Sequence, residues 1–392
     1  MEAAHRGRVL IVTWQAGGGV PPAVGLGRLL VTRGHEVVVL GPRLYQGRIE
    51  RAGCTWRPIP AEAEFDPAAG RAAEEQRTYI RETFLGPAMP AGVTAEVEAG
   101  RPDVLVIDAM LLSTVCAAQT LGLPIAALVH TTHRFHGDPE IWGGWGFDEI
   151  NEMRSGFGQP PISPAGDTVF VEMQRRCDRE LVVMPAEFDE RSDGRSNVVH
   201  VGPIFEQDAA PAEWDLPWAP DDPVPLVVVS LSSQYMHHEE PMERILEALA
   251  GLPVHVLATT GLEMDPAEVR APAGMEVRRY VPHGTVLPHA ALVVTHAGTG
   301  TLMAAFSHAV PLVCIPLGRD QPGNAERAAE LGVALSLPSA ARPDQIRAAV
   351  SEALKSPSLR SSSTWMAAVI AEYGAGSRAV AEVEALQAAP SL

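Results

Sequence analysis

Small and polar residues follow an apolar run in the second half of the chain. The run Ala291–Val294 ends at Thr295 and His296, and the turn Ala297–Thr301 (AGTGT) leads into apolar residues at helical spacing. The pattern predicts a strand, a tight turn and a helix. Small residues let backbone N–H groups approach an anion closely, and the helix N-terminus adds unpaired N–H groups. The chemistry that fits is phosphate binding, with the His296 imidazole beside the same anion.

A second apolar run, Leu312–Ile315, leads to Asp320, Gln321 and Asn324. A carboxylate and an amide are suited to binding sugar hydroxyls. Phosphate-binding and hydroxyl-binding groups at two neighbouring strand ends indicate a nucleotide sugar. Each part also has a plainer interpretation: an ordinary strand-to-helix turn, a structural histidine, and a helix cap at Asp320 and Gln321.

These residues carry a resemblance to a known family. The runs HAGTGT (296–301), PLVCIP (311–316) and DQPGNA (320–325) resemble the nucleotide-sugar signature of family 1 glycosyltransferases. The bacterial members that decorate macrolides, enediynes and aromatic polyketides are the most similar. The chain departs from the H-G-G-x-G-T pattern at Ala297, a change that the backbone accommodates if φ is negative there.

The resemblance implies an α/β fold of two facing Rossmann-like domains (GT-B), with a cleft between them and a C-terminal helix that crosses back. It implies a hexosyl- or deoxyhexosyltransferase that inverts the anomeric carbon. The donor would be a thymidine-diphosphate (TDP) sugar, or second a uridine-diphosphate (UDP) sugar, and the acceptor an apolar secondary-metabolite aglycone in antibiotic biosynthesis. The residues expected to bind the donor are Ser232, Ser233, Tyr280, Val281, His296, Gly298, Thr299, Gly300, Thr301, Asp320 and Gln321. A polar turn at Ser232 and Ser233 and a core position for Tyr280 remain alternatives.

The catalytic base is the main departure from the family. Members carry a histidine in the loop after the first strand, oriented by an aspartate; here Gly19 occupies the histidine position and Asp108 matches the aspartate. One account makes Asp108 itself the base, or His133, Asp138 or Glu140. A second has the glycine loop make space for a bulky acceptor that ionises unaided, and a third makes the chain a catalytically silent binding or auxiliary protein.

The expected acceptor site comprises Trp14, Gly18, Gly19, Phe84 and Trp142. Trp142 lies in a long segment, 130–164, that we expect to be a loop forming one wall of this site. A nicotinamide fingerprint is disfavoured because Pro22 stands where its third glycine belongs. We expect no metal site, because the histidines 130, 133 and 136 have no cysteine or paired carboxylate in register.

Composition limits the partners. A formal charge of −18 and a pI near 5.1 argue against nucleic acid or an anionic membrane as the main partner. The four cysteines form no C-x-x-C pair, which argues against a disulfide framework or a zinc site. No apolar run is long enough to span a bilayer and no signal peptide is recognisable, so we expect a cytoplasmic protein. We further expect a monomer or homodimer that uses no cofactor.

The order of elements predicts two α/β domains. Strand, helix and strand over residues 8–40 form a βαβ unit, and a broken helical stretch over 68–100 follows. We expect an acceptor-binding domain at residues 1–207, a Pro-rich acidic linker at 208–225 and a nucleotide-sugar domain at 226–375. Residues 376–392 would be the helix that packs on the first domain. The strands expected around the sites are Arg8–Thr13, Val104–Asp108, Ile125–Val129, Leu181–Met184, Leu226–Ser230, Leu292–Thr295 and Leu312–Ile315.

Overall fold

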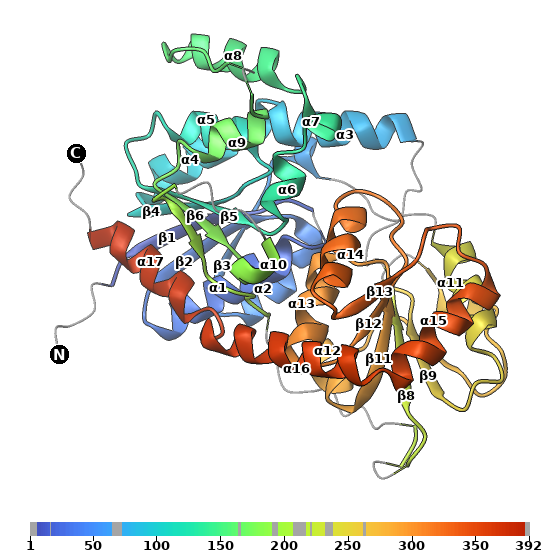
Figure 1. Ribbon diagram of the computed structural model, residues 1–392. Helices are drawn as coiled ribbons and strands as arrows, with labels where there is room; N and C mark the ends of the chain where they lie inside the picture. The colour runs from blue at the N-terminus through green and yellow to red at the C-terminus, as the bar shows by residue number, and fades with distance from the viewer. Residues whose placement is uncertain are drawn as a thin grey trace. The chain divides into compact units, whose positions relative to one another are not determined.

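The computed structural model describes residues 6–15, 17–64, 73–163, 166–189, 195–206, 217–219, 222–231, 238–261 and 264–388. The chain separates into two compact units (Figure 1). Unit 1 comprises Met1–Gln207 together with Tyr373–Leu392, and unit 2 comprises Asp208–Glu372. Most of the expected linker, at 208–216 and 220–221, lies outside the described residues.

Unit 1 is built on a parallel sheet of seven described strands in the order β3-β2-β1-β4-β5-β6-β7. The strands are β1 (Arg8–Val12), β2 (Glu36–Gly41), β3 (Thr55–Pro58), β4 (Val104–Asp108), β5 (Ile125–Val129), β6 (Arg179–Val182) and β7 (Val198–His200). The helices are α1 (Val20–Thr32), α2 (Gln46–Arg51), α3 (Ala73–Leu85), α4 (Ala88–Gly100), α5 (Leu112–Ala118), α6 (His133–His136), α7 (Pro139–Trp142), α8 (Phe147–Gly156), α9 (Val169–Gln174), α10 (Ala186–Asp189) and α17 (Ser377–Ala388).

Unit 2 has a parallel sheet of six described strands in the order β10-β9-β8-β11-β12-β13. The strands are β8 (Leu226–Ser230), β9 (His255–Thr259), β10 (Glu276–Arg278), β11 (Ala290–Thr295), β12 (Leu312–Cys314) and β13 (Ala334–Ser336). The helices are α11 (Glu239–Leu249), α12 (His283–Val286), α13 (Thr299–Ser307), α14 (Gln321–Glu330), α15 (Pro343–Lys355) and α16 (Pro357–Glu372). Two parallel sheets with helices confirm the expected α/β fold class.

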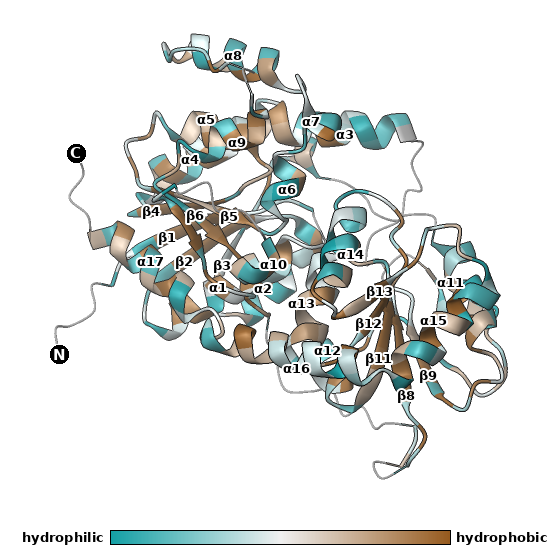
Figure 2. Ribbon diagram, in the orientation of Figure 1, coloured by the Kyte–Doolittle hydropathy of each residue, from teal (hydrophilic) through white to brown (hydrophobic). Residues whose placement is uncertain are grey.

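The central strands are mostly apolar because helices cover both faces of a parallel sheet. β4, β5 and β8 consist entirely of buried residues. Figure 2 shows the central strands of both sheets as mostly hydrophobic, while helices such as α11 and α15 carry one hydrophilic side. The polar groups that follow such strands therefore emerge at the carboxyl edge of each sheet.

The helical stretch after residue 68 agrees with the prediction, whereas the segment 130–164 does not. The helical stretch after residue 68 is interrupted at Gly86 and Pro87, as expected, which separates α3 from α4. The expectation of a loop throughout 130–164 was wrong, because α6, α7 and α8 occupy about half of this segment. Asp138 and Thr132 cap two of these helices through their side chains, which explains why a segment without long apolar periodicity is helical.

The C-terminal helix belongs to unit 1. Ala379, Val380, Val383 and Leu386 of α17 join the hydrophobic core that includes Val24 of α1. Glu384 pairs with Arg33 and His35, each at 3.1 Å. All four cysteines are buried and unpaired. Among the described residues, no helix has the length and apolar character needed to cross a bilayer.

Candidate functional site

In unit 2 the chain order of the strands changes direction between β8 and β11. Ligands of open parallel sheets bind beyond the carboxyl ends of the strands at such a point. Thr295, the last residue of β11, is level with Ser230 of β8 and Cys314 of β12. The segments that follow these three strands therefore start side by side, and two of them carry His296 and Asp320.

The N-terminus of α13 supplies the small-residue turn. Gly298 is the N-cap residue with extended backbone (φ −65°, ψ 137°), and no side chain caps the helix. A Cβ atom at Gly298 would lie 2.6 Å from His296 Nε2, so the imidazole and the turn can approach this closely only because residue 298 is glycine. An uncapped helix start beside an imidazole is suited to an anion.

His296 is a neutral imidazole in this structure. Burial is the main cause that lowers its pKa to about 3, His238 and Arg319 contribute to the lowering, and a hydrogen bond with the Ser230 backbone opposes it. The Nδ1 atom lies 3.3 Å from Thr295 Oγ1. A neutral ring fixed in this way can donate one hydrogen bond to an anion without carrying charge.

We expected alanine at position 297 to be accommodated only with a negative φ, and the structure contradicts this condition. Its φ is +69°, in the left-handed region, and its side chain is fully buried. Residues other than glycine adopt this region at a cost of about 1–2 kcal/mol. The Asn324 side-chain amide lies 3.1 Å from the Ala297 carbonyl oxygen and donates to it, which holds the turn in this conformation.

Asp320, Thr299 and Asn324 form one polar group. Asp320 Oδ2 accepts from Thr299 Oγ1 at 3.1 Å and from Asn324 Nδ2 at 2.8 Å. Asp320 is the N-cap residue of α14, but its side chain makes no capping hydrogen bond. Gln321 is buried, and its Oε1 accepts from the backbone N–H groups of Leu317 and Gly318. The structure therefore assigns part of the Gln321 side chain to holding its own loop.

The remaining residues expected to bind the donor differ in their exposure to solvent. Tyr280 is 64% exposed, so its alternative interpretation as a core residue was wrong. Val281 is buried, which leaves its backbone rather than its side chain for a ligand. Gly300 and Thr301 lie in the first turn of α13. Ser232 and Ser233 lie outside the described residues.

In unit 1 the strand order changes direction between β1 and β4, and Asp108 ends β4. Its Oδ1 accepts from the Met110 N–H at 3.0 Å, and its Oδ2 lies 3.3 Å from His130 Nδ1. Both side chains are buried. Asp108 Oδ2 and His130 Nδ1 lie at ion-pair distance but form no hydrogen bond with each other. Asp108 therefore lies beside His130, a histidine that we considered from the sequence only as a metal ligand.

His133 does not fit the base role that we considered for it. Its Nδ1 lies 2.6 Å from Asp189 Oδ2 and its Nε2 lies 3.0 Å from Glu180 Oε2, all fully buried. Burial alone would lower the pKa of His133, but the hydrogen bonds to Asp189 and Glu180 outweigh it and raise the pKa to about 9. A ring that is protonated at neutral pH and engaged at both nitrogens cannot accept a proton from a substrate.

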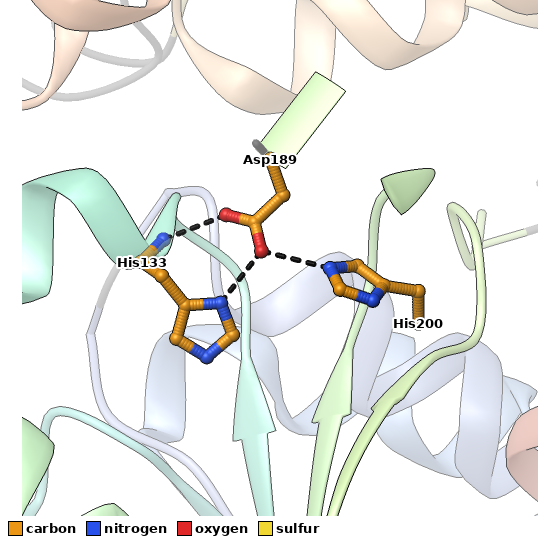
Figure 3. Close-up of side chains that lie close together, drawn as sticks. All are labelled: His133, Asp189 and His200. Carbon is orange, nitrogen blue, oxygen red and sulfur yellow. Dashed lines mark hydrogen bonds and ion pairs between the residues drawn. The ribbon is translucent and has the colours of Figure 1, made fainter. Parts of the chain in front are cut away.

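Figure 3 shows Asp189 between the rings of His133 and His200. The ligand atoms of these three residues lie within 4.8 Å of one another, a grouping that can hold a metal ion. However, Asp189 Oδ2 lies 2.6 Å from His133 Nδ1 and 2.8 Å from His200 Nε2, distances typical of hydrogen bonds. Arg195 also pairs with Glu180, so two carboxylates face two cations. We interpret this group as a structural network in which hydrogen bonds, rather than a metal ion, hold the histidines and carboxylates together.

The histidine at position 136 is neutral and structural. Its Nδ1 lies 2.6 Å from Gln174 Nε2 and its Nε2 lies 2.7 Å from Thr131 Oγ1. Burial is the main cause that lowers its pKa to about 3, the neighbouring His133 and His130 contribute to the lowering, and Asp189 and Gln174 oppose it. Neither His133 nor His136 is therefore placed for proton transfer.

An aromatic cluster lies at the expected acceptor residues. Trp14 packs edge-on against Phe84 with ring centroids 4.8 Å apart, and Trp142 packs in the same way against Phe170 at 4.7 Å. Trp145 stacks on Phe170. Phe84 is only 1% exposed, so the expectation that it contacts a ligand directly was wrong. It packs beneath the half-buried tryptophans instead.

The two acidic base candidates of the long segment lie at a helix start. Asp138 is the N-cap residue of α7 and its Oδ1 accepts from the Glu140 N–H at 2.8 Å. Glu140 is exposed. The capping bond explains an aspartate at position 138 without a catalytic role.

The chain is similar to known glycosyltransferases in sequence and in fold. Residues 243–386 match the family model "Erythromycin biosynthesis protein CIII-like, C-terminal domain". The chain is 26% identical to 4'-demethylrebeccamycin synthase of Lentzea aerocolonigenes over 90% of this chain and 93% of that protein. Among solved structures, the calicheamicin glycosyltransferase CalG4 has a TM-score of 0.78 at 24% identity and covers 97% of this chain and 98% of its own. The glycosyltransferase VinC in complex with DTDP has a TM-score of 0.70 at 20% identity, covering 97% and 99%. The resemblance to the GT-B glycosyltransferases of bacterial natural-product biosynthesis is therefore confirmed, and residues 243–386 match the model of an EryCIII-like C-terminal domain.

Proposed function

We propose that the protein is an inverting glycosyltransferase that moves a deoxysugar from a nucleoside-diphosphate sugar to an apolar secondary-metabolite aglycone. The observation that carries the proposal is the uncapped N-terminus of α13, where Gly298 lies against the neutral ring of His296. The donor and acceptor are substrates, and the proposal includes no further cofactor.

The turn at α13 is suited to the leaving diphosphate. The chain carries a net charge of −18, so attraction for a dianion must come from local groups. The N–H groups of Thr299, Gly300 and Thr301 and the His296 imidazole are such groups. They would stabilise the negative charge that develops as the bond to the anomeric carbon breaks, an effect worth on the order of 10²–10³ in rate per donor.

The polar group around Asp320 is suited to the sugar. Asp320 Oδ2 already accepts two hydrogen bonds, from Thr299 and Asn324, which fix the direction of its carboxylate. A carboxylate held in this way can accept from a sugar hydroxyl through its other oxygen. TDP is favoured over UDP as the nucleotide, a preference supported by the structurally similar VinC, which was solved in complex with DTDP.

The aromatic cluster of unit 1 is suited to an apolar acceptor. Trp14, Trp142 and Trp145 are half-buried and rest on Phe84 and Phe170. Within the described structure, the indole N–H groups of Trp14 and Trp142 are buried without a hydrogen-bond partner. Such groups favour an acceptor that carries oxygen atoms on an apolar frame.

Calorimetric titration with TDP and UDP tests the donor site. We expect one nucleotide to bind, His296→Ala to weaken binding at least tenfold, and the exposed His289→Ala to leave it unchanged. Sugar-transfer assays of the tighter nucleotide's sugars with a panel of polyketide aglycones test the reaction. Binding without transfer would favour the silent binding protein, and no binding of either nucleotide would overturn the proposal.

A further inference from the structure

In the loop after β1, the backbone of Gly19 lies close to the side chains of Asp108 and His130. Gly19 precedes α1 with φ −87°, a conformation open to any residue. A Cβ atom at Gly19 would nevertheless lie 2.5 Å from Asp108 Oδ2 and 3.1 Å from His130 Cε1. The glycine is therefore required by the closeness of the two side chains and not by its backbone.

The two side chains come from the ends of neighbouring strands. β4 ends at Asp108 and β5 ends at Val129, directly before His130, and the two strands pair in parallel with Asp108 opposite Leu128. Asp108 Oδ2 lies 3.3 Å from His130 Nδ1. The Met110 N–H, which donates to Oδ1, fixes the rotation of the carboxylate. The pair lies beside the point where the strand order of unit 1 changes direction, the place where such sheets bind ligands.

We infer that His130 is the general base of the transfer, with the carboxylate of Asp108 beside it. This inference rests on the proposed function, which it deepens by naming the group that takes the acceptor's proton. Asp108 Oδ2 lies at ion-pair distance from His130 Nδ1 without a hydrogen bond between them, and its negative charge favours the tautomer with the proton on Nδ1, so that Nε2 is the basic nitrogen. His133 and His136 cannot take this role because buried partners engage both nitrogens of each ring.

The step balances without another reactant. The acceptor hydroxyl gives its proton to His130 Nε2 while its oxygen forms the bond to the anomeric carbon. The bond between that carbon and the diphosphate oxygen breaks, and the diphosphate leaves with the electron pair. Asp108 stabilises the imidazolium that forms, and the proton passes to solvent when the product leaves.

The test uses the full chain, TDP-glucose and UDP-glucose, and para-substituted phenols from phenol to 4-nitrophenol. In His130→Asn the side chain stays polar beside Asp108 but cannot act as a base. We expect kcat/KM for phenol to fall 10²–10⁴-fold. The loss should shrink towards 4-nitrophenol, which ionises unaided, and the TDP affinity should stay unchanged because its site lies in unit 2.

A second variant separates a base from a structural residue. His130→Gly leaves room for added imidazole, which we expect to restore at least tenfold of the lost rate. Equal loss for all phenols without rescue, or no loss in either variant of an active protein, would overturn the inference and leave the proposed function standing. Wild-type protein that transfers sugar from neither donor to any phenol or aglycone would overturn both.

Discussion

The side-chain amide of Asn324 lies 3.1 Å from the carbonyl oxygen of Ala297, a residue whose φ of +69° places it in the left-handed region. The same amide lies 2.8 Å from Asp320 Oδ2. Three acceptors surround it, counting Thr299 Oγ1 at 3.3 Å. One buried amide thus joins the strained turn before α13 to the residue that starts α14.

Asn324→Asp keeps the shape of this side chain and replaces its donor with a carboxylate. The new charge would face Asp320 and the Ala297 carbonyl without a partner, and we expect a loss of about 3 kcal/mol in the free energy of unfolding. Urea unfolding measures it. Gln46→Glu makes the same change opposite Glu50 on the surface and should cost only a few tenths of a kcal/mol. Equal losses in the two variants would contradict the assignment.

Gly298→Ala tests the close approach of the turn to His296. The added methyl would lie 2.6 Å from Nε2 and must displace the imidazole or the turn. We expect the Kd for TDP to rise at least tenfold, measured by calorimetry. Gly156→Ala, at the end of α8, meets no atom within 4 Å and is the matched control. Unchanged TDP affinity in Gly298→Ala would show that the phosphate lies elsewhere.

The sequence allowed the donor turn to be predicted because its parts are contiguous. His296 to Thr301 and Asp320 to Asn324 are local runs, and the apolar strands before them are continuous. Strands buried on both faces, such as β4, β5 and β8, were predicted to the residue for the same reason. The edge strands β3 and β13 were missed, since β3 contains Arg57 and Pro58 and has little apolar character.

Pairs brought together by the sheet could not be predicted in this way. His133 meets Asp189, which is 56 residues away, and no local pattern connects them. Asp108 and His130 meet only because β4 and β5 are neighbours with aligned ends. The left-handed φ of Ala297 is likewise set by the turn geometry and by Asn324 rather than by the alanine itself.

The network around His133 predicts how stability depends on pH. Its pKa is raised to about 9 in the folded protein, against about 6.5 unfolded, so its contribution is complete below pH 6.5 and is lost as the pH rises through 9. Burial alone would raise the pKa of Asp189, but the hydrogen bonds from His133 and His200 outweigh it and lower the pKa, so Asp189 acts in the opposite direction. Its contribution is present above about pH 3.8 and is lost as the pH falls further.

We therefore expect the free energy of unfolding to decline between pH 6.5 and 9 by an amount on the order of 3 kcal/mol. Urea unfolding across this range measures it, and His133→Gln should remove the decline. A nuclear magnetic resonance titration of labelled histidines in the wild type provides the same answer if the variant does not fold. A His133 ring that titrates near pH 6.5 would refute the network's charge assignment.

Gly19→Ala and Gly18→Ala distinguish the space beside Asp108 from the rest of the glycine loop. A methyl at residue 18 would lie 3.5 Å from His130 Cδ2, an ordinary contact, whereas one at residue 19 would lie 2.5 Å from Asp108 Oδ2. Both Asp108 and His130 are buried, so neither can move without disturbing its neighbours. We expect Gly19→Ala to lower the free energy of unfolding by about 1–3 kcal/mol and Gly18→Ala to change it by less than about 0.5 kcal/mol.

Urea unfolding of the two variants and the wild type measures this difference under one set of conditions. The comparison separates two reasons for glycine at position 19. If the loop needs only backbone freedom, the two alanine variants should behave alike, because neither glycine has a positive φ. If Asp108 and His130 occupy the room that a methyl group at residue 19 would need, only Gly19→Ala is destabilised. The free energy of unfolding lost through Gly19→Ala should then be smaller in a chain that carries His130→Gly, since His130 Cε1 is the second atom that the new methyl meets.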